Sequence, residues 1–157
     1  MTDKSSLPLG VFKTSPDATL PTQATDRAQC IDFYAAEDKV IYPGETVLID
    51  LGVKIVLPEG YGMEFRERSG LATKGIIVGG GIIDEDYHGP LKAIVRYMAA
   101  VPTGSHREPV IVKTGNKILQ AELVKRIPIE IRKIDEGAIE RAIEYSERGE
   151  KGFGSTE

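Results

Sequence analysis

The chain has 157 residues, a formal net charge of −4 and a single cysteine, Cys30. This length predicts one domain, and the negative charge argues against a general nucleic-acid-binding protein, which needs a basic face. One cysteine excludes an intramolecular disulfide and gives no cysteine cluster for a metal. No apolar run reaches membrane-spanning length, and the N-terminus has no apolar signal core. We therefore expect a cytoplasmic protein that does not bind membranes.

Alternating apolar residues predict that most of the chain forms β-strands. Aromatic residues are 6% of the chain, so Val and Ile must build much of the core, and both favour strands. Residues 1–26 are rich in Pro, Ser, Thr and Asp, which predicts an extended arm with at most one edge strand. Short strands separated by turn residues indicate an all-β sandwich or barrel. The alternating positions are Val47, Ile49, Leu51, Val53 and Ile55, then Leu91, Ala93, Val95 and Tyr97, and finally Ile127, Ile129 and Ile131.

The C-terminal part follows a different pattern. In residues 135–147 the apolar side chains recur at helical spacing, which predicts a short helix that must pack on another element to be stable. The tail from Arg148 is polar and rich in Gly, so we expect it to be mobile until a ligand orders it. We therefore divide the chain into a body, residues 1–147, and a C-terminal lid, residues 148–157.

The first candidate motif is the run 66–71, Arg-Glu-Arg-Ser-Gly-Leu. An Arg fork, the Ser69 hydroxyl and the Gly70 amide together suit phosphate oxygens. Because the net charge is negative, a polyanionic small substrate requires that a few Arg and Lys converge locally. The alternative interpretation is a polar turn that opens a helical stretch, with Ser69 as its cap.

The second candidate motif is the run 81–89, Gly-Ile-Ile-Asp-Glu-Asp-Tyr-His-Gly. Asp84 follows two apolar residues that would face a core, so it could lie in a shielded pocket and act as a general base. Tyr87 offers a flat face for a base or a sugar. The alternative interpretation is a solvated hairpin turn, since Asp and Gly are turn formers.

The third candidate motif is the tail itself, residues 148–156, in which a lone Phe153 lies among glycines. A single Phe cannot build a core, so it must pack on a partner or a ligand unless the tail is only a disordered end. Residues 115–120 read as a turn entering a strand. Asp32 lies in an apolar stretch, where it could bind a metal or satisfy nearby amides. We interpret Cys30 as a small buried hydrophobe, because no motif pairs it with a histidine base.

Taken in order, these segments resemble the five motifs of the trimeric deoxyuridine triphosphatase family. The resemblance runs from about Leu20 to Thr156. Its first motif falls on Asp32, the second on residues 68–71 and the fourth on residues 115–120. The third, residues 81–87, matches almost residue for residue, and the fifth is residues 148–156. The resemblance implies an all-β, jelly-roll-like sandwich that assembles into a homotrimer, with three sites between subunits.

The resemblance also implies an activity, the hydrolysis of dUTP to dUMP and pyrophosphate, which removes dUTP from the nucleotide pool. Asp84 would orient the water that attacks the α-phosphorus, and Tyr87 would pack on the deoxyribose and exclude a 2′-hydroxyl. Asp32 would order water around a Mg²⁺ carried by the triphosphate, as an outer-shell ligand. The implied substrate-binding residues are Arg68, Ser69, Gly70, Gly81, Ile83, Tyr87, Gln120, Arg148, Phe153, Gly154 and Ser155.

Several positions depart from the family pattern, and they concern residues that support the site. The stretch 98–109 is also somewhat longer than usual, which makes it a candidate contact for an additional protein partner. One alternative function is a deoxycytidine triphosphate deaminase, which shares the fold but has a glutamate in a different third motif. Another is a nucleotide-dependent binding or regulatory protein. The departures are Cys30 for Gly, Glu67 for Pro, His88 for Arg, Asn116 for an acidic residue, Lys117 for Arg and Lys151 for Gly.

Overall fold

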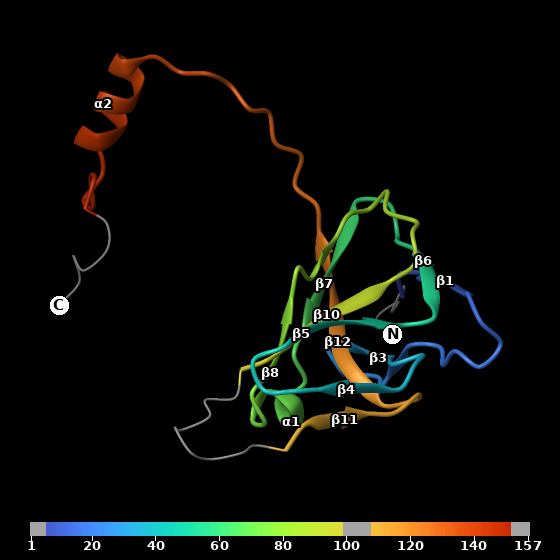
Figure 1. Ribbon diagram of the computed structural model, residues 1–157. Coiled ribbons are helices and arrows are strands. Elements are labelled where there is room, and N and C mark those ends of the chain that lie inside the picture. Colours follow the sequence, from blue (N-terminus) through green and yellow to red (C-terminus); the bar gives the residue numbers. More distant parts are fainter. Residues whose placement is uncertain (1–5, 99–107, 152–157) are drawn as a thin grey trace, which may run out of the picture. The chain divides into compact units, whose positions relative to one another are not determined.

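A computed structural model describes residues 6–98 and 108–151 of the protein (Figure 1). The chain divides into two compact units, residues 1–126 and residues 127–157. In the described residues, no helix is long and apolar enough to cross a membrane. The strands of the first unit are β1 (Gly10–Lys13), β2 (Thr22–Gln23), β3 (Ile31–Tyr34), β4 (Lys39–Ile41), β5 (Thr46–Asp50), β6 (Val53–Val56), β7 (Tyr61–Arg66), β8 (Ile76–Gly79), β9 (Ile82–Ile83), β10 (Lys92–Tyr97), β11 (Val110–Val112) and β12 (Lys117–Lys125). The helices are α1 (Ser69–Ala72), in the first unit, and α2 (Glu136–Glu144), in the second.

The first unit is an all-β, jelly-roll-like fold in which every strand pair is antiparallel. Its largest sheet has the order β2-β3-β12-β7-β9, and smaller sheets are formed by β5-β10-β8, by β11-β4 and by β1-β6. Neighbouring strands such as β3 and β12 come from distant parts of the sequence (Figure 1). Side chains therefore meet in this fold only after long-range pairing has set the register.

One apolar core joins the four sheets. Phe33 of β3 and Phe65 of β7 lie with ring centroids 5.6 Å apart, in a tilted arrangement that suits aromatic pairs. Ile49, Val95 and Ile41 add buried aliphatic side chains from the smaller sheets. The predicted alternation in residues 47–55 and 91–97 agrees with this core, since the odd-numbered positions are the more buried ones.

The long alternating run 47–55 is interrupted at Gly52, which divides it into β5 and β6. Gly52 is buried and has a φ of +66°, a left-handed conformation that other residues adopt at a cost. A Cβ atom there would lie 2.6 Å from the Cβ of Ala18 and 2.7 Å from that of Ala36. The sharp bend between the two sheets thus depends on the absence of a side chain.

Three expectations about strands and burial outside the motifs were wrong. The N-terminal arm contains two strands, β1 and β2, rather than at most one, because β6 and β3 each offer it an edge. Ile127, Ile129 and Ile131 do not form a strand and are 77%, 82% and 95% exposed. Pro128 cannot donate a ladder hydrogen bond, and β12 ends at Lys125. Cys30 is only partly buried.

The predicted helix in residues 135–147 is confirmed as α2. Asp135 is its N-cap and accepts a hydrogen bond from the backbone N–H of Ala138 at 2.8 Å. None of its residues is buried. The expected packing partner of this helix is therefore not found within the second unit as described.

We expect Gly52→Ala to destabilise the protein by more than the dihedral cost alone. Gly44 provides the matched control, because it has a φ of +85° and open space around its missing Cβ. Gly44→Ala should cost about 1–2 kcal/mol from the left-handed backbone. Gly52→Ala should cost about 1–3 kcal/mol more, from the added contacts with two alanines. Equal free energies of unfolding for the two variants, measured in urea, would contradict the packing argument.

Candidate active site

A cleft of about 800 Å³ brings together residues of the first, second and fourth motifs, among them Asp32, Arg68 and Gln120. We call it the cationic cleft. It lies where α1 follows β7, beside β11 and the turn that enters β12, and α1 and β11 are neighbours in Figure 1. Three cations and one carboxylate line this cleft in a protein of net charge −4, which is the local convergence of Arg and Lys that a polyanionic substrate requires. The polar side chains that line it are Asp32, Arg68, Ser69, Lys74, Asn116, Lys117 and Gln120.

Asp32 is the centre of this cleft, and it is 7% exposed. One of its oxygens, Oδ1, lies 3.0 Å from Nε of Arg68, and the other, Oδ2, lies 2.7 Å from Nζ of Lys117. The hydrogen bond to Asp32 raises the pKa of Lys117, so this amine stays charged. The buried carboxylate thus pairs with two cations at once and orients both, and such pairing is how a buried charge is made tolerable.

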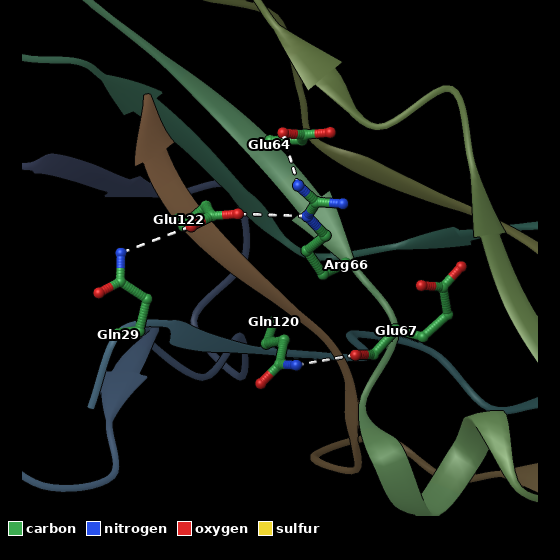
Figure 2. A network of polar contacts seen from close by, with 6 residues as sticks. All are labelled: Gln29, Glu64, Arg66, Glu67, Gln120 and Glu122. Atoms are coloured by element: carbon green, nitrogen blue, oxygen red, sulfur yellow. Dashed lines mark hydrogen bonds and ion pairs between the residues drawn. The ribbon is translucent and has the colours of Figure 1, made fainter. Parts of the chain in front are cut away.

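The backbone before Arg68 is fixed by Glu67. The amide Nε2 of Gln120 donates to the Glu67 carbonyl at 2.8 Å (Figure 2). The Glu67 carboxylate in turn accepts from the backbone N–H of Val78 at 3.0 Å, on β8. Arg68 itself is the N-cap of α1, and no side chain caps that helix. The alternative interpretation of Ser69 as a cap is therefore wrong, and the exposed Ser69 is free of that role.

The turn that enters β12 is held against the β3–β4 connection by Asp38. Its carboxylate accepts from Nζ of Lys113 at 2.7 Å and from the backbone N–H of Thr114 at 2.9 Å. These bonds, with that of the Thr114 hydroxyl, lower the pKa of Asp38 to about 2. Asn116 closes the same turn by accepting from the N–H of Lys113. The predicted turn and strand in residues 115–120 are confirmed.

The third motif lines a different cleft, of about 390 Å³, which we call the Asp84 cleft. The polar side chains that line it are those of Asp84, Tyr87 and Lys92. The backbone N–H of Tyr87 donates to the Asp84 carbonyl at 3.1 Å, so Asp84 opens a tight turn after β9. The expectation that both preceding residues face a core was wrong, because Ile82 is 75% exposed.

Tyr87 is held in a defined place beside this turn. Its hydroxyl donates to the carbonyl of Pro90 at 3.1 Å, and its ring lies over Gly89. A Cβ on residue 89 would meet the tyrosine oxygen at 2.4 Å, so only glycine leaves room for the ring. Tyr87 is 44% exposed, so part of the residue is open to solvent.

The register of β7 separates the two clefts. β7 pairs with β9 through Met63–Ile83 and Glu64–Ile82, so Asp84 lies beyond the start of the ladder, opposite Gly62. Arg68 lies six residues further along the same extended segment. At about 3.3 Å per residue this corresponds to roughly 20 Å. Asp84 and Arg68 of one chain therefore do not reach the same phosphate group.

Charged side chains of β7 and β12 form a network on the largest sheet (Figure 2). Arg66 lies between Glu64 at 3.0 Å and Glu122 at 3.2 Å, and Gln29 donates to Glu122. Arg66 also stands opposite Gln120 in the register. Such exposed pairs add little stability individually, so they cover this sheet without contributing to either cleft.

Lys74 is the residue of the cationic cleft that sequence reasoning missed. It is exposed and follows α1 closely, where its side chain joins the lining. Its position a few residues after Ser69 and Gly70 was the feature of the sequence that could have indicated it.

Phe153, Gly154 and Ser155 of the predicted lid lie outside the described residues, as does most of the 98–109 stretch. Arg148 is described, and its Nε donates to the carbonyl of Lys151 at 2.9 Å within the second unit.

Asp32 is the only carboxylate lining the cationic cleft, as the structure describes it, that could contact a cation. Among the described residues, no group of three or more His, Cys, Asp or Glu is placed to hold a metal. Asp32 is an oxygen donor beside the cations, and a carboxylate has about four lone-pair sites, so its two ion pairs leave acceptor capacity. Mg²⁺ retains much of its water shell in proteins, which fits an outer-shell contact with Asp32.

Comparison with known proteins places the chain in one family of enzymes. Residues 16–157 match the model of the dUTPase family. A deoxyuridine 5'-triphosphate nucleotidohydrolase of Hydrogenobaculum sp. is 37% identical over 150 residues, which cover 93% of this chain and 95% of that protein. The human mitochondrial enzyme of the same name is 35% identical over 145 residues, covering 92% of this chain and 52% of that one.

Solved structures agree with this assignment. A variant dUTPase of Staphylococcus bacteriophage 80alpha, bound to dUpNHpp, has a TM-score of 0.80 and 25% identity, covering 94% of this chain and 97% of that one. A dUTPase of phage phi11 of S. aureus, described with a structural Mg(II) ion, has a TM-score of 0.75 and 24% identity, covering 82% and 97%. The chain belongs to the dUTPase family.

Asp38 should make the stability of the protein depend on pH in the acid range. Its folded pKa is lowered to about 2 from 3.8, so its stabilising effect is present above 3.8 and is lost as the pH falls through about 2. Asp38→Asn should therefore lower Tm near neutral pH, and the gap to the parent should close as the pH falls toward 2. Asp26→Asn, at an exposed position, is the control and should leave Tm unchanged. A gap that stays constant over this range would show that the Asp38 charge has no role.

Proposed function

We propose that the protein hydrolyses dUTP to dUMP and pyrophosphate, with Asp84 as the general base. Membership of the dUTPase family identifies the chain as a dUTP diphosphatase. In the proposed reaction a water molecule attacks the α-phosphorus, and its proton passes to the Asp84 carboxylate. The bond from the α-phosphorus to the oxygen that bridges it to the β-phosphate breaks, and pyrophosphate leaves.

The observation that carries this proposal is the complementary chemistry of the two clefts. The cationic cleft, with Arg68, Lys74 and Lys117, suits the charge of a triphosphate. The Asp84 cleft combines a carboxylate, an aromatic face and apolar walls, which suit a pyrimidine nucleoside beside an attacking water. Positioning and charge neutralisation supply most of the catalysis of phosphoryl-type reactions, and the two clefts divide these tasks.

Mg²⁺ is proposed as a companion of the triphosphate, near Asp32. When bound, it would neutralise charge on the phosphate oxygens. Asp32 itself holds Arg68 and Lys117 in place. It would therefore act on the nucleotide first by positioning these two cations. Gln120 remains the proposed contact to the α-phosphate, because its amide is anchored at Glu67 beside the cleft.

We propose a homotrimer in which each site combines clefts of different subunits. The separation of roughly 20 Å along β7 requires a second chain to bring Arg68 near an Asp84. Exposed apolar side chains also surround the Asp84 cleft, with Leu48 at 53% and Ile94 at 36% exposure. The exposed Ile127, Ile129 and Ile131 add an apolar stripe that a neighbouring subunit can cover. The lid of residues 148–157 would close over the assembled site.

Replacing Asp84 by Asn should lower kcat for dUTP by about 10²-fold or more, because the shape is retained and the base is lost. Pyrophosphate release from dUTP, dTTP, dCTP and UTP with Mg²⁺ provides the measurement. The parent should prefer dUTP, and Tyr87→Ala should narrow the gap between dUTP and UTP because Tyr87 excludes the 2′-hydroxyl. Ammonia release from dCTP would indicate a deaminase instead. An Asp84→Asn variant as active as the parent would refute the proposed base.

A further inference from the structure

The turn that carries Asp84 has few bonds of its own. β9, which leads into it, contains two residues and pairs with β7 at only two positions, on the edge of the sheet. Beyond Ile83 the ladder ends, and the hydrogen bond from the N–H of Tyr87 to the Asp84 carbonyl closes the turn. A general base must be held closely, since a misplacement of about 1 Å can cost about 10²-fold in rate. Some further contact is needed to fix this turn on the body.

The adjacent residue, Glu85, supplies that contact. Its Oε1 accepts from the backbone N–H of Gly60 at 2.9 Å, and its Oε2 accepts from Nε of Arg126 at 2.9 Å. Gly60 and Arg126 are also joined to each other, because the N–H of Arg126 donates to the Gly60 carbonyl at 2.8 Å. One carboxylate therefore ties three segments together: the third-motif turn, the β6–β7 turn and the end of β12.

The charge state of Glu85 agrees with this arrangement. The hydrogen bond from the Gly60 N–H, followed by the bond and the charge of Arg126, lowers the pKa of the Glu85 carboxyl. The Glu85 side chain is 26% exposed, whereas that of Arg126 is 58% exposed. An ion pair with so exposed a partner adds little to global stability. The arrangement fixes the position of a turn far more than it stabilises the fold.

We propose that Glu85 is a positioning residue for catalysis, acting through Asp84. Its carboxylate binds Gly60 and Arg126, and these bonds fix the position of the turn that carries Asp84. Arg126 is the last residue of the first unit, so the same carboxylate also fixes the residue from which residues 127–157 continue. This inference rests on the proposed role of Asp84 as the base. It assigns a function to a motif position whose side chain does not line the Asp84 cleft.

The test compares Glu85→Ala with two partial variants and one control. Glu85→Ala removes both bonds and should lower kcat for dUTP about tenfold, with KM within about twofold of the parent. Glu85→Gln retains an acceptor for the Gly60 N–H, and Arg126→Gln retains the Gly60 bond, so both should lose less. Glu59→Gln removes an exposed charge beside the same turn and should keep the parent's kcat. The Tm of all four variants should stay close to that of the parent.

A double variant separates positioning from a general structural effect. Because Glu85 acts through Asp84, Glu85→Ala should have almost no further effect on kcat in an Asp84→Asn background. A structural role would reduce kcat by the same factor in both backgrounds, and that result would overturn the proposal. A parent-like kcat for Glu85→Ala would overturn it as well, and would leave the role of Asp84 intact if Asp84→Asn alone is impaired. A fully active Asp84→Asn single variant would refute the proposed base itself.

Discussion

The antiparallel pairing of β7 with both β12 and β9 is the constraint on which the functional geometry depends. It anchors Arg68 just beyond one end of the strand and Asp84 beside the other. Because strand geometry fixes the rise per residue, side-chain rearrangement cannot bring the two together within a chain. A site that needs both a phosphate-binding cation and a base must then use the complementary ends of two chains. The need for a second chain at each proposed site is thus a consequence of the sheet register.

Electrostatics divides the work between the clefts. In the cationic cleft, Asp32 holds Arg68 and Lys117 while leaving a net positive charge for a polyanion. In the third-motif turn, Glu85 is itself satisfied by Gly60 and Arg126. Both carboxylates are engaged by donors from distant parts of the chain. Each carboxylate therefore fixes the position of residues beside a proposed reacting group, and it does so only after strands distant in sequence have paired.

The sequence predicted the features that depend on local pattern. Alternation predicted the core strands, helical spacing predicted α2, and the second and third motif runs contain residues that line the two clefts. It could not predict that Ile82 is exposed, because burial of an edge strand depends on which sheet packs above it. Strand periodicity at Ile127 was likewise misleading, since a strand requires a partner edge that the pattern does not specify. Lys74 and the Glu85 contacts depend on pairings 25 to 41 residues apart or on the cleft geometry, which local reading does not reach.

The most direct test of the account combines two inactive variants in one assembly. Asp84→Asn and Arg68→Ala chains carrying different tags are co-expressed, and mixed assemblies are isolated through both tags. If each site takes Asp84 from one chain and Arg68 from its neighbour, a mixed trimer has one site with both native residues, so it should recover about one third of the parent's dUTP hydrolysis. If both residues served the same site from one chain, every site would carry a lesion. Activity no higher than that of the separate variants, or the absence of mixed assemblies, would contradict the account.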